Sequence, residues 1–312
     1  MSQTVAVLGA YASLPAPGHV QEYYDLLGQD CRVRGLELPY RDALVEDGEA
    51  AFLSQLPNHW DRHVVTAIPG TMVRAWADPG FGLASTSPQG RSDALAFVRG
   101  VRDAVEALNT AASRRIVACV EVHSAPPGPH GVAHSAEAFG ESLSALLNLD
   151  WGGASLLVEH CDAWIANDRG EKRMLTLDDE IDVVRAIGRP DLRMSLNWGR
   201  SALEGRSAST ALEQVRTARA AGVLEGVTFS GAGPVDTPYA KAWMDGHLPL
   251  DVDEPGSVMT AAEVRECAEA ALAAGPGPEV SYLGAKCQVP QAASLAERAA
   301  MLRRILDATG AF

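Results

Sequence analysis

The sequence has few cysteines, and none of them are paired at the C-x-x-C spacing. The five are scattered and odd in number: Cys31, Cys119, Cys161, Cys267 and Cys287. A disulfide framework or a common zinc site needs a regular set of cysteines. The sequence therefore predicts reduced thiols in a cytoplasmic protein.

Long hydrophobic runs and an excess of positive charge are also absent. No run approaches the roughly 18 apolar residues of a membrane span, and the apolar N-terminus TVAVLGAYASLPA lacks the basic start of a signal peptide. The net charge of −14 repels nucleic acids and anionic membranes. We therefore expect a soluble protein with a small-molecule ligand and no nucleic-acid or membrane partner.

Short apolar runs alternate with helical patterns along the whole chain. The expected strands are residues 4–9, 32–38, 63–68, 115–122, 156–160, 193–197, 226–230 and 279–285. The expected helices are residues 19–27, 49–56, 91–111, 135–149, 176–187, 209–221, 260–274 and 295–309. Strands that are apolar on both faces and alternate with helices are typical of a parallel barrel.

The sequence thus predicts an α/β fold, a single (β/α)8 TIM barrel spanning residues 1–312. Long loops are expected after strands 3 and 7, at Thr71–Gln89 and Gly231–Val258. The alternative is a doubly wound open sheet, which usually has fewer strands and a glycine-rich phosphate turn. GAGPVD after the seventh strand does not match that turn, and no Walker motif is present.

Polar side chains stand at the ends of most of the expected strands, where TIM barrels carry their active sites. They are Glu37, Glu121, His123, Glu159, His160, Asn197, Ser230 and Lys286. Glu159 and His160 are adjacent and point to opposite faces of their strand, and we expect His160 to face the helices. Glu159 at the end of a buried strand needs a partner, and a plain ion pair with an arginine is the structural alternative to a catalytic role.

The two long loops carry aromatic side chains that could form walls for a sugar ring. Trp76 lies in the first loop, and Trp243 and His247 lie in the second. Tryptophans of this kind also pin loops to the protein, so both interpretations stay open. Cations that follow strand ends predict a positive site and an anionic ligand, and they are Arg41, Arg200, Arg206, Lys241 and Lys286. Such arginines alternatively solvate the rim or pair with acids.

Several short motifs resemble those of a known superfamily. LELP at the second strand, VHSAP at the fourth and LLVEH at the fifth resemble the xylose-isomerase-like barrels. FSGAG and the W-x-D-x-H loop resemble the uncharacterised DUF4862 branch of that superfamily. The resemblance implies a TIM barrel related to sugar isomerases, ketose epimerases, inosose dehydratases and endonuclease IV, and it is compatible with a homo-oligomer.

The resemblance also implies positions for a divalent metal after strands five to eight. A glutamate, an aspartate, a histidine and a glutamate are typical there, whereas this chain has Glu159, Asn197, Ser230 and Lys286. An ammonium group repels a dication, and neutral side chains do not replace the negative charge of the missing carboxylates. We therefore expect no metal and no other cofactor.

The remaining side chains form an acid/base set that favours metal-independent proton transfer next to a carbonyl group of a sugar-like substrate. Glu159 would be the base or proton relay, and His123 a second acid/base group. Lys286 is expected within reach of Glu159, as a structural partner, a stabiliser of a developing anion or a Schiff-base nucleophile of a lyase. Glu37, Glu121 and Asn197 would orient hydroxyl groups, with Ser230, Arg200, Trp76, Trp243 and His247 as further substrate contacts.

Isomerase, epimerase and lyase activities share that first step. The alternative from another class is a non-catalytic barrel that binds a sugar or sugar acid. A DNA-repair nuclease is a third class, disfavoured by the acidic net charge and the replaced ligands.

Overall fold

Eight parallel strands close into one barrel in the computed structural model, which describes residues 4–128, 133–165 and 170–312. Each strand pairs with the next, and the first pairs with the last. The strands are β1 (Val5–Leu8), β2 (Val33–Pro39), β3 (His63–Thr66), β4 (Val117–Val122), β5 (Ser155–His160), β6 (Leu192–Asn197), β7 (Leu224–Phe229) and β8 (Tyr282–Ala285). The predicted (β/α)8 fold is confirmed.

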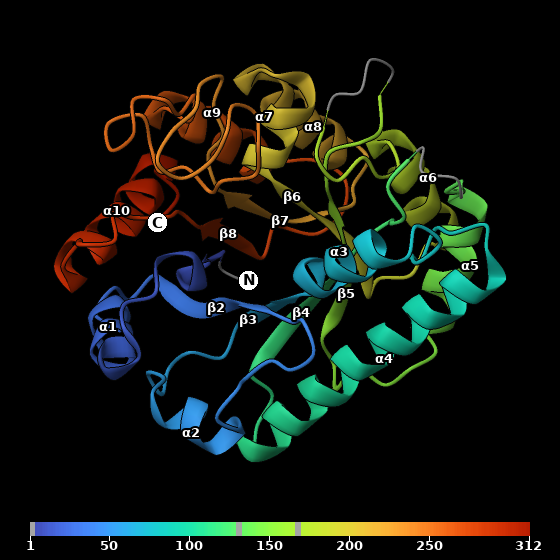
Figure 1. Ribbon diagram of the computed structural model, residues 1–312, viewed down its shortest axis with the longest axis horizontal. Helices are drawn as coiled ribbons and strands as arrows, with labels where there is room; N and C mark the ends of the chain where they lie inside the picture. Colours follow the sequence, from blue (N-terminus) through green and yellow to red (C-terminus); the bar gives the residue numbers. More distant parts are fainter. Residues whose placement is uncertain (1–3, 129–132, 166–169) are drawn as a thin grey trace.

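The α-helices form a ring outside the barrel (Figure 1). They are α1 (Val20–Gly28), α2 (Glu49–Ser54), α3 (Ile68–Ala77), α4 (Pro88–Ala111), α5 (Ala136–Leu146), α6 (Leu177–Ile187), α7 (Trp198–Gly205), α8 (Ala208–Ala220), α9 (Ala261–Leu272) and α10 (Leu295–Thr309), and two short 3-10 helices, η1 (Ala10–Ser13) and η2 (Pro17–His19), follow β1. The first and last helices, α1 and α10, contact each other and so close the ring.

Local signals in the sequence set the ends of several helices. The Thr176 side chain accepts a hydrogen bond from the Asp179 amide at the start of α6, and Gly188 ends that helix with φ of 64°. At α10, Ser294 and Glu297 form a reciprocal capping box. Both helices were predicted with nearly these bounds, because cap residues and left-handed glycines are readable from sequence.

Two helices next to the barrel mouth were not predicted. The expected loop Thr71–Gln89 is in part the end of α3, which carries Pro69 in its first turn. Proline is tolerated there because the first helical amides have no intrahelical acceptor, so Pro69 is compatible with a helix that begins at Ile68. Helix α7 starts directly after β6 and is too short to show a helical period. The predicted long segment after β7 is confirmed, since no helix or strand lies between Phe229 and Ala261 among the described residues.

The inside of the barrel is apolar at one level and polar above it. A cluster of Val7, Val64, Cys119, Leu157 and Tyr282 fills its lower level. Glu121 and Glu159 lie two residues beyond Cys119 and Leu157, so alternation places them on the same inner face one level nearer the mouth. The strand pattern therefore delivers carboxylates to the carboxyl-terminal end of the barrel.

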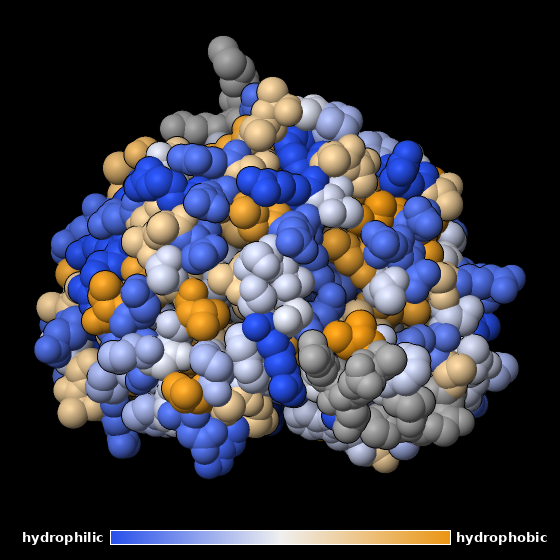
Figure 2. Space-filling model, turned by 90° about the horizontal axis from the view of Figure 1, so that it is seen from above, coloured by the Kyte–Doolittle hydropathy of each residue, from blue (hydrophilic) through white to orange (hydrophobic). Residues whose placement is uncertain are grey.

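Among the described residues, no helix is both long enough and apolar enough to cross a bilayer. On the face shown in Figure 2, hydrophobic residues are scattered among hydrophilic ones. Isolated apolar residues of this kind are ordinary for a protein surface.

Candidate active site

The Glu159 carboxylate is held between a cation and an imidazole. Arg200 Nη1 lies 2.6 Å from Glu159 Oε1, and His123 Nε2 lies 2.7 Å from Oε2. All three side chains are almost fully buried. Burial alone would raise the pKa of Glu159, but Arg200 and His123 outweigh it and hold that pKa below its usual range. Glu159 thus has an arginine as its ion-pair partner.

His123 is the neutral member of this pair. Burial lowers its pKa although the contact with Glu159 opposes that effect. Bonding to the carboxylate through Nε2 favours the tautomer with its proton on that nitrogen. The other nitrogen, Nδ1, is buried and has no hydrogen-bond partner among the described residues. His123 therefore keeps one basic lone pair unused.

Asp245 joins three elements at the mouth. Its carboxylate lies 2.9 Å from Arg200 Nε, 3.0 Å from Lys172 Nζ and 3.1 Å from His247 Nδ1. Burial would raise the pKa of Asp245, but Lys172, His247 and Arg200 bring it well below the ordinary value. The segments after β5 and β7 are thus tied to α7 through one ionised carboxylate.

Lys286 lies at the end of β8, and its partner differs from the expected one. Its ammonium lies 2.8 Å from Glu37 Oε1 and donates to the Tyr11 hydroxyl at 3.1 Å. Glu159 is not the direct ion-pair partner of Lys286, because Arg200 contacts Glu159 and Glu37 contacts Lys286. Lys286 nevertheless lies close enough to Glu159 to help lower its pKa. Burial favours the neutral amine, but Glu37 and Tyr11 outweigh it and raise the pKa of Lys286. Lys286 is therefore an ammonium at neutral pH.

Glu121 lies inside the barrel below these groups. The Ser195 and Tyr282 hydroxyls donate to its Oε1 at 2.8 and 2.9 Å. Its Oε2 is buried and has no hydrogen-bond partner among the described residues. Burial, with Glu159 and Glu37 nearby, raises the pKa of Glu121 well above its ordinary value. These surroundings thus favour the protonated, neutral form of the Glu121 carboxyl group.

His160 faces the helices, as predicted from strand alternation. Its Nδ1 lies 2.7 Å from Glu180 of α6, and its Nε2 lies 3.2 Å from Glu204 of α7. Burial opposes protonation, but the two carboxylates raise the pKa of His160 to about 10. This buried ion cluster fixes β5 against its helices behind the site.

Asn197 and Ser230 serve neighbouring groups of the site. The Asn197 side-chain oxygen accepts hydrogen bonds from the amides of Gly199 and Arg200, so it starts α7 and sets the position of Arg200. Ser230 Oγ lies 2.9 Å from Nδ1 of His247. Both residues therefore have structural partners in addition to any contact with substrate.

The side chains around Glu159 do not fit a divalent cation. His123, Glu159 and Cys161 have potential ligand atoms within 4.8 Å of one another. The guanidinium of Arg200 contacts both Glu159 and the Cys161 sulfur, the latter at 3.5 Å. Burial also raises the pKa of the Cys161 thiol, which disfavours the thiolate that binds metals. The Arg200 guanidinium thus occupies the ligand atoms that a metal ion would need.

The other aromatic and cationic residues predicted for the site are more exposed than this buried cluster. Trp76 on α3 is 65% exposed, and Trp243 is half-buried with φ of 54°. Arg41, Arg206 and Lys241 are exposed, and Lys241 pairs with Asp236. Arg200 and Lys286 are therefore the two predicted cations that reach the barrel interior.

Three members of the cluster were missing from the predicted set. Asp245 belongs to the W-x-D-x-H motif but is not among the predicted site residues. Tyr11 follows β1 on η1, where a tyrosine amid small residues is the one visible signal. Lys172 lies before α6, and nothing in the local sequence marks it.

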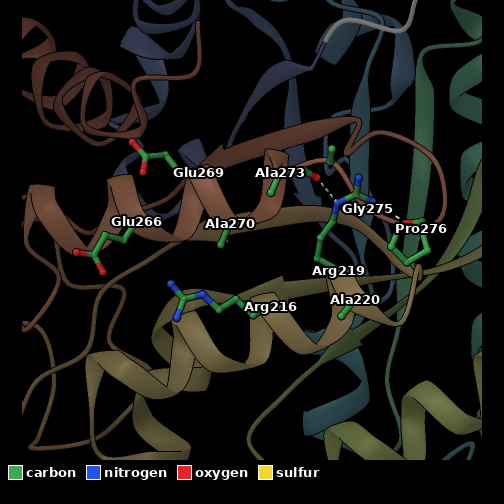
Figure 3. A pocket seen from close by; sticks show the side chains of 10 residues that line it. Arg216, Arg219, Ala220, Glu266, Glu269, Ala270, Ala273, Gly275 and Pro276 are labelled. Carbon is green, nitrogen blue, oxygen red and sulfur yellow. Dashed lines mark hydrogen bonds between the residues drawn. The ribbon is translucent and has the colours of Figure 1, made fainter.

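One cavity lies beside the site, and another lies on the outer face of the barrel. One of about 500 Å³ adjoins the site and includes Tyr11 and Glu37 among its walls. Another lies on the outer face between α8 and α9 (Figure 3). In that groove Arg219 bonds the carbonyl groups of Ala273, Pro276 and Pro278. Arg219 therefore has a structural role in holding the end of α9.

Comparison with solved structures defines the class of this barrel. The IolI protein with a bound zinc atom aligns with a TM-score of 0.61 at 11% identity, over 99% of both chains. D-psicose 3-epimerase in the presence of D-fructose aligns at 0.56 and 12% identity, over 98% of this chain and 97% of its own. A xylose isomerase domain protein from Alicyclobacillus acidocaldarius aligns at 0.54 and 13%, over 99% and 98%. The chain has the fold of xylose-isomerase-like sugar isomerases and epimerases.

The sequence itself places the chain in a family within that class. The family described as "Domain of unknown function (DUF4862)" matches residues 7–301, so the chain belongs to the DUF4862 family. It is also 33% identical over 276 residues to the uncharacterized protein STM3670 of Salmonella typhimurium strain LT2, covering 86% of each chain.

Proposed function

We propose that the protein is an isomerase or epimerase of a small polyhydroxylated carbonyl compound that works by metal-independent proton transfer. The observation that carries the proposal is the Glu159 carboxylate held between Arg200 and His123 at the end of β5. Permanent cations at the barrel mouth supply positive charge in the region where superfamily members use a metal. The fold of the chain supports a sugar-like substrate.

In this proposal His123 takes the proton from the carbon next to the carbonyl group. Its Nδ1 is the free basic atom, and Glu159 fixes the ring through Nε2 and stabilises the imidazolium that forms. Both oxygens of Glu159 are engaged, and its pKa lies below the usual range. Glu159 therefore acts as the relay partner of His123 and not as the base itself.

Lys286 and Arg200 stabilise the negative charge that develops on the substrate oxygen. Both remain protonated at neutral pH, because carboxylates raise the pKa of each against the effect of burial. Fixed cations in a water-poor site stabilise an enediolate without reorganising during the reaction. A protonated Lys286 is a poor nucleophile, which disfavours the Schiff-base lyase alternative.

Solvent exchange tests this proposal without knowledge of the product. The chelator-treated protein is incubated in D2O with ketoses, aldoses, sugar acids and sugar phosphates, and loss of the proton next to the carbonyl group is followed by NMR. We expect exchange with at least one compound, and a drop of about a hundredfold or more in His123→Gln. Exchange that needs an added divalent metal would contradict the proposal.

A non-catalytic sugar-binding barrel is the second candidate. It is supported by the mutual pairing of Glu159, Arg200 and Asp245, which leaves these charges satisfied without substrate. Binding of a sugar acid or sugar phosphate without any proton exchange, unaffected by His123→Gln, would favour this second function.

A further inference from the structure

The cavity beside the site is lined by the end of β2, by the segments that follow β1, β2 and β3, and by residues of α1 and α2. Most of its walls therefore lie on the side of the barrel mouth. Its volume is about 500 Å³. Its polar walls are Tyr11, Glu37, Arg41 and Glu46. Its apolar walls include Leu14, Tyr24, Leu36, Leu38, Leu44 and Phe52.

One end of the cavity belongs to the proposed active site. Tyr11 donates to Glu37 at 3.3 Å and accepts from the Lys286 ammonium at 3.1 Å. Lys286 is fully buried, whereas Tyr11 is half-buried. Tyr11 therefore forms a wall shared by the Lys286 cluster and the cavity.

The rest of the cavity is an apolar chamber. Leu36 and Leu38 alternate with Glu37 along β2, so they face the helices while Glu37 faces the barrel. Phe52 of α2 and Leu44 are only half-buried, and Leu14 is 40% exposed. These side chains leave apolar surface uncovered within reach of a polar catalytic centre.

We infer that this chamber binds an apolar substituent of the substrate, which makes the substrate a sugar derivative with an attached alkyl, acyl or aromatic group. The inference rests on the proposed function for the sugar part. These walls would not stabilise an unsubstituted sugar. Its hydroxyl groups would lose their hydrogen bonds to water when they contact leucine and phenylalanine. An apolar chain of several carbons instead gains about fourfold in affinity for each methylene it buries.

The inference is tested with three defined probes: methyl β-D-glucoside, hexyl β-D-glucoside and 1-hexanol. Dissociation constants are measured by NMR titration of the full-length protein. We expect hexyl glucoside to bind at least tenfold more tightly than methyl glucoside, and 1-hexanol to compete with it. Equal affinities of the two glucosides would overturn the inference.

Variants locate the binding in the chamber. Leu44→Arg places a charge on its wall, and Ala43→Trp fills it from an exposed position. Leu272→Arg on α9 is the matched control, since Leu272 is 37% exposed and lies outside the chamber. We expect both chamber variants to lose the tenfold preference for the hexyl chain, and the control to keep it. A preference unchanged in Leu44→Arg and Ala43→Trp would contradict the inference.

The outcomes separate this inference from the proposed function. If 1-hexanol binds in the chamber as tightly as hexyl glucoside, the apolar site stands, and the proposed function is decided separately by the D2O exchange assay. If methyl glucoside binds and the longer chain adds nothing, the apolar site fails alone. A change of molar mass in Leu44→Arg, measured by light scattering, would show instead that a second copy covers the chamber, which also overturns the inference.

Discussion

The Arg200 guanidinium lies 2.6 Å from the Glu159 carboxylate and 2.9 Å from Asp245, and all three side chains are buried. It therefore links the end of β5 to the segment after β7. The Asn197 side chain, which caps α7, holds the Arg200 amide at the first turn of that helix. One cation thus organises the mouth of the barrel.

Replacing Arg200 with methionine should strongly destabilise the fold. The change leaves the buried Glu159 carboxylate without its cation, whereas Asp245 keeps Lys172. Breaking a buried pair in this way costs about 3–5 kcal/mol of unfolding free energy. Urea unfolding measures the loss, and Arg41→Met is the control because Arg41 is exposed. A loss in Arg200→Met no larger than that in Arg41→Met would show that the ion pair is not structural.

Lys286 should not form a covalent adduct with carbonyl compounds. Glu37 raises its pKa, so it stays an ammonium at neutral pH and lacks the lone pair for a Schiff base. Incubation with ketoses, aldehydes and borohydride, followed by intact-mass spectrometry, should leave the protein mass unchanged. A mass increase that disappears in Lys286→Met would restore the lyase interpretation.

His160 should stabilise the protein in a pH-dependent way. Its folded pKa is raised to about 10, above the ordinary value of about 6.5 in the unfolded chain. Its contribution is therefore complete below about pH 6.5 and is lost as the pH rises toward 10. The difference in unfolding free energy between wild type and His160→Gln should shrink over this range.

His59→Gln, at an exposed position, controls for the loss of an imidazole. A wild-type advantage over His160→Gln that grows with pH would mean that His160 is buried in its neutral form.

Glu121 should carry a proton at neutral pH. Burial, with Glu159 and Glu37 nearby, raises its pKa, and Ser195 and Tyr282 both donate to the same oxygen. Infrared difference spectra should therefore show a protonated carboxyl band that Glu121→Gln removes. Glu204→Gln is the matched control, because His160 and other donors lower the pKa of Glu204 despite its burial. The same band lost in Glu204→Gln and kept in Glu121→Gln would reverse this assignment.

Much of the fold could be predicted, because the apolar pattern of strands buried on both faces and their alternation with helices can be recognised in the sequence. The direction of His160 followed from the two-residue period of β5 and is confirmed. The position of Glu159 at the barrel mouth followed from its place at the carboxyl-terminal end of the same strand. These properties depend on neighbours along the chain.

The pairing of charges could not be predicted in the same way. Glu159 has Arg200, and Lys286 has Glu37, because long side chains reach across the barrel to whichever partner is nearest in space. Lys172 reaches Asp245 from a segment 73 residues away in sequence. Tyr11 was missed because small residues follow β1, and the tyrosine lies among them on η1.

The central claim is that Arg200 and Lys286 supply the positive charge of the site without a divalent metal. Elemental analysis of protein purified without chelator or added metal tests it most directly, with Glu159→Gln prepared in parallel. We predict far less than one equivalent of manganese, cobalt, zinc or magnesium in both proteins, because a fixed guanidinium engages Glu159. About one equivalent in the wild type that is lost in Glu159→Gln would contradict the account.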